Sequence, residues 1–293
     1  MKKILIAGAN SYIGCSFEAY AKEHYSGEFE IYTIDMIDGS WRDKNFSMYD
    51  IVFHVAGLAH ADVGNVSEEI KKKYYAINTD LAIETAKKSK AEGVGQFVFM
   101  SSMIVYGDMG CITMDTKPCP GNFYGDSKWQ AEKGIRELQS ESFCVTILRP
   151  PVVYGSGSKG NYPMLAKFAR KLPIFPKVNT KRSFLYIGKL CEFLCQIMKS
   201  AQAGVFFPQN KEIVSICEMV KTIAAENERR IVITPILMPL AMLGMKLPGK
   251  IGGLCTKAFG NRYYEPGMSD CGINYQVYGF EESIKLTERG LNE

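Results

Sequence analysis

The chain has 293 residues, of which 46% are hydrophobic and 23% charged, an ordinary globular composition with enough length to bury a large core. The net charge is +4, with lysine and arginine spread along the chain, so the sequence gives no sign of a nucleic-acid-binding surface. Nine cysteines without a framework spacing and only three histidines argue against a disulfide scaffold and a zinc site, and we expect no metal.

The N-terminus and the most apolar stretch of the sequence bear on where in the cell the protein is found. Only four apolar residues, Ile4 to Ala7, precede Gly8, which is too few for the core of a signal peptide. No stretch reaches the roughly 18 uncharged apolar residues of a membrane span. The nearest candidate, 231–245, contains Pro235 and Pro239. We interpret it as a buried or lid segment, with contact to a membrane or a partner as the alternative. We expect a cytoplasmic protein.

The first half of the chain alternates short apolar runs with amphipathic segments. The runs are rich in β-branched and aromatic residues, have the length of buried strands, and lie at 3–8, 30–35, 50–57, 96–102 and 144–150. Helical patterns lie between them at 13–25, 67–92 and 124–140. Strands that alternate with helices predict a parallel sheet covered on both faces. We therefore expect a Rossmann-type, doubly wound α/β domain over residues 1–150.

The second half of the chain is less regular. A Gly/Ser-rich loop leads into a helix at about 163–171, and a strand-like "GVFFPQN" follows at 204–210. Further helices are expected at about 215–227 and over the terminal "EESIKLTERG". This pattern predicts a smaller, irregular substrate-binding lobe over residues 151–293, with some of its strands returning to the main sheet.

The segment "GANSYIG" (8–14) lies between the first expected strand and the first expected helix. A tight glycine turn here lets backbone N–H groups approach a pyrophosphate, which the helix N-terminus also stabilises. Asp35 ends the second strand, where a carboxylate accepts from both ribose hydroxyls of an adenosine and repels a 2′-phosphate; Met36, not an arginine, comes next. The expected cofactor is therefore NAD rather than NADP. Its candidate contacts are Gly8, Asn10, Ser11 (where a second glycine is usual), Tyr12, Ile13, Gly14 and Asp35.

Tyr124 and Lys128, in "FYGDSKWQAEK", stand four residues apart at the start of an expected helix, so their side chains share a face. A free tyrosine titrates at about pH 10 and needs help to act as a base at neutral pH; the Lys128 ammonium and the positive nicotinamide ring of an oxidised cofactor would together favour the phenolate. YxxxK alone occurs by chance in many helices. However, "FMSSMIVYG" (99–107) places Ser101 and Ser102 at the carboxyl end of a strand, where open α/β sheets bind ligands. A serine there can hold the reacting oxygen while Tyr124 moves its proton.

These residues resemble the extended short-chain dehydrogenase/reductases, specifically the NAD-dependent sugar-nucleotide epimerase/dehydratase group, over almost the whole chain. "FHVAG" (53–57) is similar to the family's strand that lines the cofactor, and Asn78 to its structural asparagine. "SSMIVYG" is similar to its SSxxVYG block, and "YGDSK" to its catalytic YxxxK. "LRPPVVYGSG" is similar to the segment that closes over the nicotinamide, and "RSFLYIGKL" (182–190) to the stretch whose first arginine holds a nucleotide diphosphate.

The resemblance implies a catalytic trio of Ser102, Tyr124 and Lys128, in which Lys128 also holds the nicotinamide ribose. It implies that Arg182 binds the diphosphate of the substrate. Arg262, in "FGNRYYE", is a candidate for a second phosphate contact, because the arginine fork suits phosphate oxygens. Further cofactor contacts are expected at Ala56, Gly57 and Pro151. Further substrate contacts are expected at Ser101 and at Asn161, for which a purely structural loop role is the alternative.

The residues that follow the catalytic serine bear on the reaction. The family's 4,6-dehydratases carry an Asp-Glu acid/base pair where this chain has Met103 and Ile104, which cannot transfer protons, so dehydration is disfavoured. The resemblance instead implies hydride chemistry at C4 of a nucleotide-activated sugar. We expect a UDP-sugar 4-epimerase of surface polysaccharide biosynthesis, and an NAD(P)H-dependent 4-keto-sugar reductase stays open as the alternative.

A non-catalytic NAD-binding regulatory protein is a second alternative function. The presence of both Tyr124 and Lys128 argues against this alternative. By analogy with the family, we expect a homodimer formed through the helix that carries this pair and the helix before it. His54 and His60 flank the cofactor strand, where a histidine is more often packed or surface-exposed than catalytic.

Overall fold

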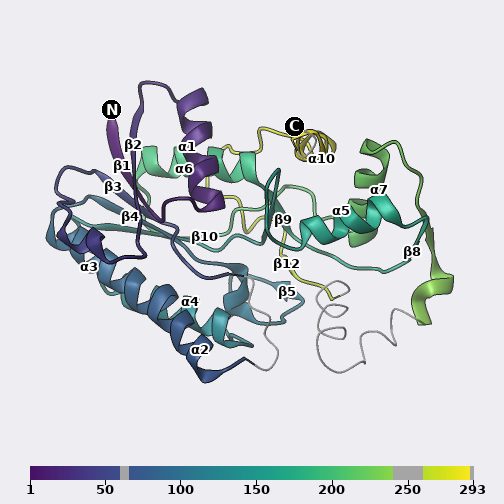
Figure 1. The fold of residues 1–293 in the computed structure, drawn as a ribbon, viewed down its shortest axis with the longest axis horizontal. Helices are drawn as coiled ribbons and strands as arrows, with labels where there is room; N and C mark the ends of the chain where they lie inside the picture. Colours follow the sequence, from purple (N-terminus) through teal and green to yellow (C-terminus); the bar gives the residue numbers. More distant parts are fainter. Residues whose placement is uncertain (60–65, 240–259, 291–293) are drawn as a thin grey trace.

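The computed structural model describes residues 1–59, 66–239 and 260–290. Its centre is a six-stranded sheet in the order β10-β6-β4-β3-β1-β2, and every pair of neighbouring strands in it is parallel (Figure 1). The strands from the first half are β1 (Lys2–Ala7), β2 (Phe29–Ile34), β3 (Ile51–His54), β4 (Gln96–Met100) and β6 (Cys144–Leu148). Each coincides with one of the predicted apolar runs to within a few residues, which confirms the predicted fold class.

Helices cover both faces of this sheet. On one face, α1 (Tyr12–His24) packs against α6 (Ile187–Ser200), and on the other lie α2 (Glu68–Tyr75), α3 (Leu81–Ala91) and α4 (Phe123–Arg136) (Figure 1). The covering explains why β3 and β4 are buried along their whole length and read as continuous apolar runs.

Alternate side chains of β1 show the two layers of the core. Ile4 and Ile6 belong to one buried cluster, and Leu5 and Ala7 to another, because successive residues of a strand point to opposite faces. The first of these clusters also contains residues of α5 (Tyr162–Lys171), α6, α7 (Ile216–Glu226) and α10 (Phe280–Arg289). The two halves of the chain therefore share one hydrophobic core.

The helix predicted over 67–92 is interrupted in the structure. A single π-helical turn, Ala76–Asp80, separates α2 from α3. The turn carries Asn78, whose side chain is fully buried. A π turn leaves the apolar pattern of the flanking helices intact, so the sequence pattern does not reveal it.

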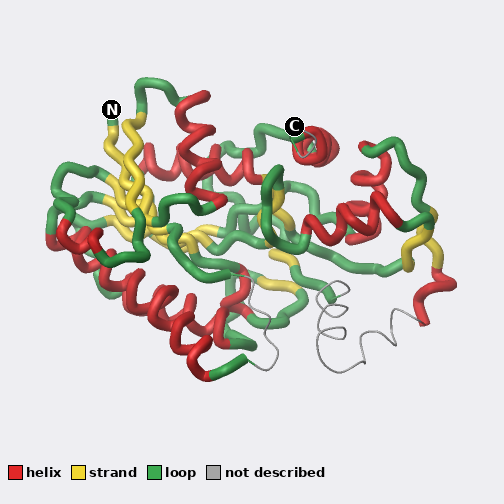
Figure 2. Tube along the Cα trace, in the orientation of Figure 1, coloured by secondary structure: helices red, strands yellow, loops and turns green. Residues whose placement is uncertain are grey.

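The second half extends the main sheet and builds several small ones. β10 (Gly204–Phe206) pairs with β6, so the main sheet includes a strand from beyond residue 150. The division into residues 1–150 and 151–293 stays a prediction. Three two-stranded parallel sheets pair β7 (Val152–Tyr154) with β9 (Phe184–Tyr186), β8 (Ile174–Pro176) with β11 (Val232–Thr234), and β5 (Cys111–Ile112) with β12 (Tyr263–Tyr264) (Figure 2).

The apolar 231–245 segment, expected to be buried or to form a lid, is only partly buried over its described part: Ile231 packs in the core, whereas its neighbours are exposed. Val232 on β11 is 60% exposed, and Ile236, in the 3-10 turn Pro235–Leu237, is 83% exposed. The physical reason is that β11 pairs only with β8 in a two-stranded sheet, and the outward-facing side chains of both strands are exposed among the described residues. Residues 240–245 lie outside the described residues. Within the described part of the chain, no helix is both long and apolar enough to cross a bilayer.

Candidate active site

The turn between β1 and α1 has the tight backbone that the sequence predicts. Gly8 has φ +130°, and a Cβ there would lie 2.6 Å from the backbone nitrogen of Ala56, so glycine is needed where the turn crosses the segment after β3. Asn10 also adopts a positive φ of 62°, which asparagine tolerates. The Ser11 hydroxyl caps α1 by accepting a hydrogen bond from the N–H of Gly14 at 3.2 Å. Serine in place of a second glycine thus stabilises the helix start at which a pyrophosphate is predicted to bind.

Two side chains beside this turn test whether NAD fits it. Asp35 directly follows β2 and is exposed; its Oδ1 accepts from the N–H of Ile37 at 2.8 Å, which leaves Oδ2 available for a ribose hydroxyl. The Tyr12 hydroxyl is buried and has no hydrogen-bond partner among the residues that the structure describes. A Cβ on Gly155 would lie 2.7 Å from that hydroxyl, so the loop after β7 lies against the turn. The unpaired Tyr12 hydroxyl and the available Asp35 oxygen suit a bound dinucleotide. The Ile13 side chain, also a predicted cofactor contact, packs against the core instead.

The segment after β3 is tied to α4 through Asn78. The Asn78 Oδ1 accepts from the N–H of Leu58 at 2.8 Å, and its Nδ2 donates to the Oγ of Ser127 at 3.0 Å. A Cβ on Gly57 would lie 3.0 Å from both Asn78 Oδ1 and Lys128 Nζ. Gly57 therefore leaves the space in which the lysine ammonium lies, and the π turn that carries Asn78 sets the distance between strand and helix.

Ser102 and Tyr124 lie near the carboxyl end of β4. Ser102 caps the 3-10 turn Met103–Tyr106 by accepting the N–H of Ile104 at 3.2 Å, and its hydroxyl acts to lower the pKa of Tyr124. Asn122 caps α4 by accepting the N–H of Gly125 at 2.9 Å, which places Tyr124 in the first turn of that helix. A phenol that can transfer a proton and a hydroxyl that can hold the same substrate oxygen thus both lie at the ligand-binding edge of the sheet.

Lys128 lies one helical turn further along α4, and its ammonium donates to the Met100 carbonyl at 3.0 Å, 4.8 Å from the centroid of the Phe99 ring. Burial raises the pKa of Tyr124 to about 12 and lowers the pKa of Lys128 to about 8. The sequence argument expects the ammonium, together with the positive nicotinamide ring of bound oxidised cofactor, to lower the pKa of the phenol. In the protein chain itself burial is the largest influence on the pKa of Tyr124. A further positive charge at the site is therefore needed before Tyr124 becomes a base at neutral pH.

A buried ion pair behind these residues is the feature that sequence reasoning missed. Glu132, fully buried, follows Lys128 by one turn of α4, and Arg149, 3% exposed, follows β6. The Arg149 Nη2 donates to Glu132 Oε2 at 2.5 Å, and its Nε donates to Oε1 at 3.0 Å. The Glu132 charge raises the pKa of Lys128 against the effect of burial. The signal for Glu132 is its spacing: residues 124, 128 and 132 share one face of a helix.

Ser101, a predicted substrate contact, belongs to this buried network. Its hydroxyl donates to Glu132, and the residue is 4% exposed. Adjacent residues at a strand end point in opposite directions, so Ser102 points away from the ion pair that Ser101 reaches. Ser102 is therefore the serine that remains placed for chemistry.

Arg182 and Arg262, the predicted diphosphate contacts, lie on adjacent segments. They form a parallel β-bridge in which the N–H of Ser183 donates to the Arg262 carbonyl at 3.1 Å. Burial, and secondarily the charge of Arg262, lowers the pKa of Arg182 to about 10. Arg262 also pairs with Asp108. Two guanidinium groups held close together favour binding of a polyvalent anion between them.

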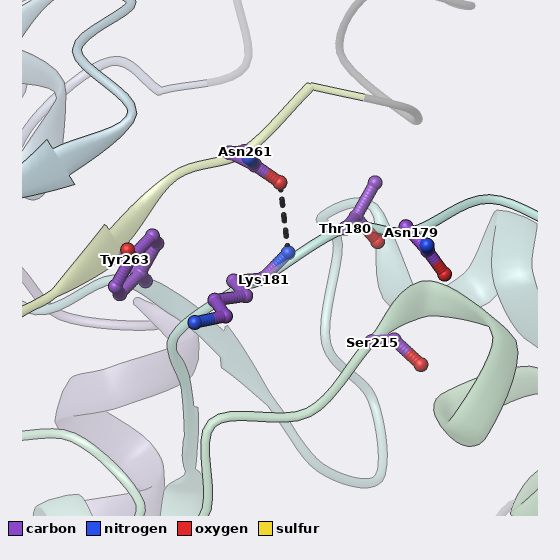
Figure 3. A pocket seen from close by; sticks show the side chains of 6 residues that line it. All are labelled: Asn179, Thr180, Lys181, Ser215, Asn261 and Tyr263. Carbon is purple, nitrogen blue, oxygen red and sulfur yellow. Dashed lines mark hydrogen bonds between the residues drawn. The ribbon is translucent and has the colours of Figure 1, made fainter.

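A polar pocket of about 440 Å³ adjoins this bridge (Figure 3). Its lining residues are Asn179, Thr180, Lys181, Ser215, Asn261 and Tyr263. The backbone N–H of Lys181 donates to Asn261 Oδ1 at 2.9 Å, and the Lys181 ammonium lies 5.6 Å from the centroid of the Tyr263 ring. Because Lys181 and Asn261 immediately precede the two arginines, the pocket extends the cationic surface of the bridge.

The remaining predicted contacts lie on the segments that follow β6. Pro151 is buried, and the carbonyl of the preceding Pro150 accepts the N–H of Met103 at 2.9 Å, so this segment lies against the turn after Ser102. Asn161 precedes α5 without capping it through its side chain. No contact in the described structure joins Asn161 to Tyr124, and its role stays a prediction.

His54 is packed, in agreement with the expectation from the sequence. The residue is 0% exposed, and its ring lies 5.9 Å from that of Phe97 and 6.0 Å from that of Phe99. Neither imidazole nitrogen has a hydrogen-bond partner among the described residues. Burial, and secondarily the charge of Lys128, lowers the pKa of His54 to about 3, so it is a neutral core side chain. His60 lies outside the described residues.

A model of the NAD-dependent epimerase/dehydratase family matches residues 4–213, which include the glycine turn, Ser102, Tyr124, Lys128 and Arg182. The chain belongs to this family. Its membership confirms the resemblance stated from the sequence and the expectation of NAD as cofactor.

Two characterised relatives are 4-epimerases. A UDP-glucose 4-epimerase of Vibrio cholerae is 31% identical over 213 residues, which are 69% of this chain and 63% of the relative. An N-acetyl-alpha-D-glucosaminyl-diphospho-ditrans,octacis-undecaprenol 4-epimerase of Escherichia coli O157:H7 is 28% identical over 237 residues, 78% of this chain and 69% of the relative. The match to the Vibrio enzyme thus covers less than two thirds of that enzyme's length.

Solved structures share the fold over the whole chain. MoeE5 in complex with UDP-glucose and NAD has a TM-score of 0.75 at 18% identity, over 99% of this chain and 98% of that one. A dTDP-4-dehydrorhamnose reductase from Clostridium acetobutylicum has a TM-score of 0.74 at 17% identity, over 99% of this chain and 100% of that one. At these identities the likeness establishes the fold, and both epimerase and reductase names occur among relatives and neighbours.

Proposed function

We propose that this member of the NAD-dependent epimerase/dehydratase family is a 4-epimerase of a sugar joined to a diphosphate, with a UDP-sugar as the expected substrate. The observation that carries the proposal is that Ser102 caps the turn after β4, Tyr124 stands in the first turn of α4, and the Lys128 ammonium, one turn further, donates to the Met100 carbonyl at the end of β4. The Vibrio cholerae relative, a UDP-glucose 4-epimerase, supports the same reaction class.

The residues have distinct roles in this proposal. NAD, when bound, supplies the acceptor and donor of a hydride at C4 of the sugar. Ser102 holds the O4 oxygen, and Tyr124 takes the proton from it and later returns it. Lys128, whose ammonium lies beside Gly57, holds the cofactor ribose and keeps a positive charge in the site. A sugar held only through its diphosphate at Arg182 and Arg262 is free to present either face between the two proton transfers.

Dehydration lacks an acid/base pair in this site. Met103 and Ile104, which follow Ser102, form part of a 3-10 turn, and Met103 is 4% exposed. Neither side chain exchanges protons, so a leaving hydroxyl would receive no proton from this turn.

The test separates epimerase from reductase. The purified protein is incubated with UDP-glucose and with UDP-N-acetylglucosamine, and the sugar products and the bound nucleotide are measured. Interconversion at C4 with NAD retained supports the epimerase. Consumption of NADH in proportion to a reduced 4-keto sugar would show the reductase instead. If neither the native protein nor Tyr124→Phe turns over any of these substrates, the non-catalytic NAD-binding protein is favoured instead. Turnover by Tyr124→Phe at the native rate would show that another group moves the proton.

The carrier of the sugar is a second question for the same assay. The Escherichia coli relative is named for a sugar joined to undecaprenol through a diphosphate. Such a substrate would offer the Arg182–Arg262 bridge the same diphosphate as a UDP-sugar. The assay therefore includes a polyprenyl-diphosphate-linked N-acetylglucosamine in detergent. Turnover of this compound alone would assign the lipid carrier.

The cellular setting is part of the proposal. We propose a cytoplasmic enzyme of surface polysaccharide biosynthesis that forms a homodimer through α2 and α4. Ile70 on α2 is 44% exposed, which supports an apolar contact on this helix pair. Sedimentation at micromolar concentration is expected to give a dimer that Ile70→Glu converts to a monomer. A monomeric native protein would contradict the dimer alone.

A further inference from the structure

The end of the second half carries apolar side chains where a solvated strand face is normally polar. In the β8–β11 pair, Ile174 lies opposite Val232. Phe175, the next residue on β8, is 3% exposed and packs in the core, so Ile174 points outward, since successive strand residues face opposite sides. Ile174 is 43% exposed and Val232 60%. Both faces of this ribbon are therefore apolar, although only one faces the core.

Two further apolar side chains extend this outer face. Leu172, directly after α5 and before β8, is 39% exposed, and Ile236, in the turn after β11, is 83% exposed. We call Leu172, Ile174, Val232 and Ile236 the apolar patch. Figure 1 shows β8 and the turn after β11 at the end of the molecule opposite to the six-stranded sheet. The patch is thus remote from the glycine turn, and contacts to NAD do not account for it.

Cationic side chains border the apolar patch. Lys171 precedes Leu172, Lys177 follows β8, and Arg229 and Arg230 precede β11; all four are exposed. The backbone N–H of Lys177 donates to the Thr234 carbonyl at 2.9 Å, which holds this residue against β11. None of the four cations forms an ion pair within the part of the chain that the structure describes. Their charges are therefore available to an external anion.

The surrounding sequence strengthens the charge. No aspartate or glutamate occurs between Glu141 and Glu192, the stretch that contains β8, nor between Glu228 and Glu265, the stretch that contains β11. The nearest acids in the sequence, Glu226 and Glu228, lie at or just after the end of α7, and Glu288 of α10 is already paired with Arg170. A chain with a net charge of only +4 thus concentrates cations around one exposed apolar surface. Apolar side chains bordered by lysine and arginine are complementary to a bilayer with anionic headgroups.

We propose that the apolar patch and its bordering cations bind the surface of an anionic lipid bilayer. The patch side chains would enter the boundary between headgroups and acyl chains, and the four cations would contact lipid phosphates. This mode needs no membrane span. It goes beyond the proposed epimerase reaction and does not depend on it, because it would hold the protein at a membrane whatever the sugar carrier is.

The test is flotation of the full chain with vesicles of phosphatidylcholine, with or without phosphatidylglycerol. The native protein is expected to float with the vesicles that contain phosphatidylglycerol, and increasing salt is expected to weaken the binding. Arg229→Gln/Arg230→Gln and Val232→Ser/Ile236→Ser are each expected to lower the partition coefficient by about tenfold or more. These positions are exposed, so the variants are expected to keep the fold. Turnover of UDP-glucose would verify that the fold is kept; if the native protein shows no turnover, NAD binding serves instead.

Matched variants on other surfaces are the control. Lys44→Gln/Lys117→Gln removes the same charge, and Met48→Ser/Met114→Ser removes two exposed apolar side chains, 46% and 69% exposed, elsewhere. Both are expected to float as the native protein does.

Three results would overturn the proposal. In the first, the native protein stays in solution in the presence of the anionic vesicles. In the second, the patch variants float as the native protein does. In the third, the patch variants sediment as monomers where the native protein is a dimer, because the patch would then join two copies of the chain. Flotation without any sugar turnover would refute the proposed function and leave the membrane contact standing.

Discussion

His54 gives a quantitative test of how burial sets charge in this protein. The imidazole is fully buried, both of its nitrogens lack partners within the described residues, and burial lowers its pKa from about 6.5 to about 3. The folded protein therefore binds fewer protons than the unfolded chain wherever the pH lies between these values. The contribution of His54 to the free energy of unfolding is fully present above pH 6.5 and is lost as the pH falls toward 3.

The size of the effect follows from the shift. Each pH unit below the unfolded pKa costs about 1.4 kcal/mol until the folded pKa is reached. Between pH 7 and pH 5 the loss from His54 alone is about 2 kcal/mol, because roughly one and a half units separate pH 5 from the unfolded pKa. His54→Leu has similar volume and no titration, so this part of the pH dependence should vanish in the variant.

The assay compares the native protein and His54→Leu by urea unfolding at both pH values. Carboxylates titrate equally in both proteins, so the difference between the two pH dependences isolates His54. Proton NMR of the imidazoles is an independent measurement, simplified because the chain has only three histidines. A His54 signal that titrates near pH 6.5, or equal pH dependences for the two proteins, would refute the reasoning.

Three further changes test the site. Tyr124→Phe should lower kcat by about a hundredfold or more, while NAD binding, measured by equilibrium dialysis, stays intact. An unchanged kcat would show that another group moves the proton. Glu132→Gln leaves Arg149 buried without its carboxylate and should lower the free energy of unfolding by about 3–5 kcal/mol, whereas Glu132→Leu/Arg149→Met should recover most of it in urea unfolding. A double variant as unstable as the single one would contradict this. Arg182→Ala should raise KM for the diphosphate-linked sugar about tenfold with kcat nearly unchanged; a loss confined to kcat would place Arg182 in another role.

The central fold could be predicted from the sequence because its signals are local. Five apolar runs predicted the first-half strands of the six-stranded sheet, since strands covered on both faces have no polar side to disguise them. The two-residue β5 in the same half is too short to give such a signal. The π turn that carries Asn78 could not be predicted, because one additional residue in a helical turn leaves the flanking apolar pattern unchanged. The exposure of Val232 and Ile236 also escaped prediction. An apolar run reports hydrophobicity, and only the tertiary structure shows whether anything covers it.

The site was predicted to the extent that its residues belong to short motifs. The nearness of Ser102 and Tyr124 follows from a strand end and a helix start at one sheet edge. Glu132 and Arg149 are far apart in sequence and pair only in the folded chain, so sequence reasoning missed them, although the spacing from Lys128 could have singled out Glu132. The strong effect of burial on Tyr124 could not be predicted, because burial depends on the packed surroundings of the phenol and not on its neighbours in the sequence. That the ammonium and the ring of bound NAD together favour the phenolate stays a prediction.

The pairing of β10 with β6 has a consequence for how the chain is made. During synthesis the first half leaves the ribosome first, yet its sheet ends at β6 with an open hydrogen-bonding side until Gly204–Phe206 has emerged. α6, which packs on α1, is translated only shortly before that strand. A nascent chain arrested at residue 150 would expose both the unpaired strand and the bare surface of α1, and such edges attract other chains. Truncations near the middle of this protein are therefore expected to aggregate instead of yielding a separable nucleotide-binding half.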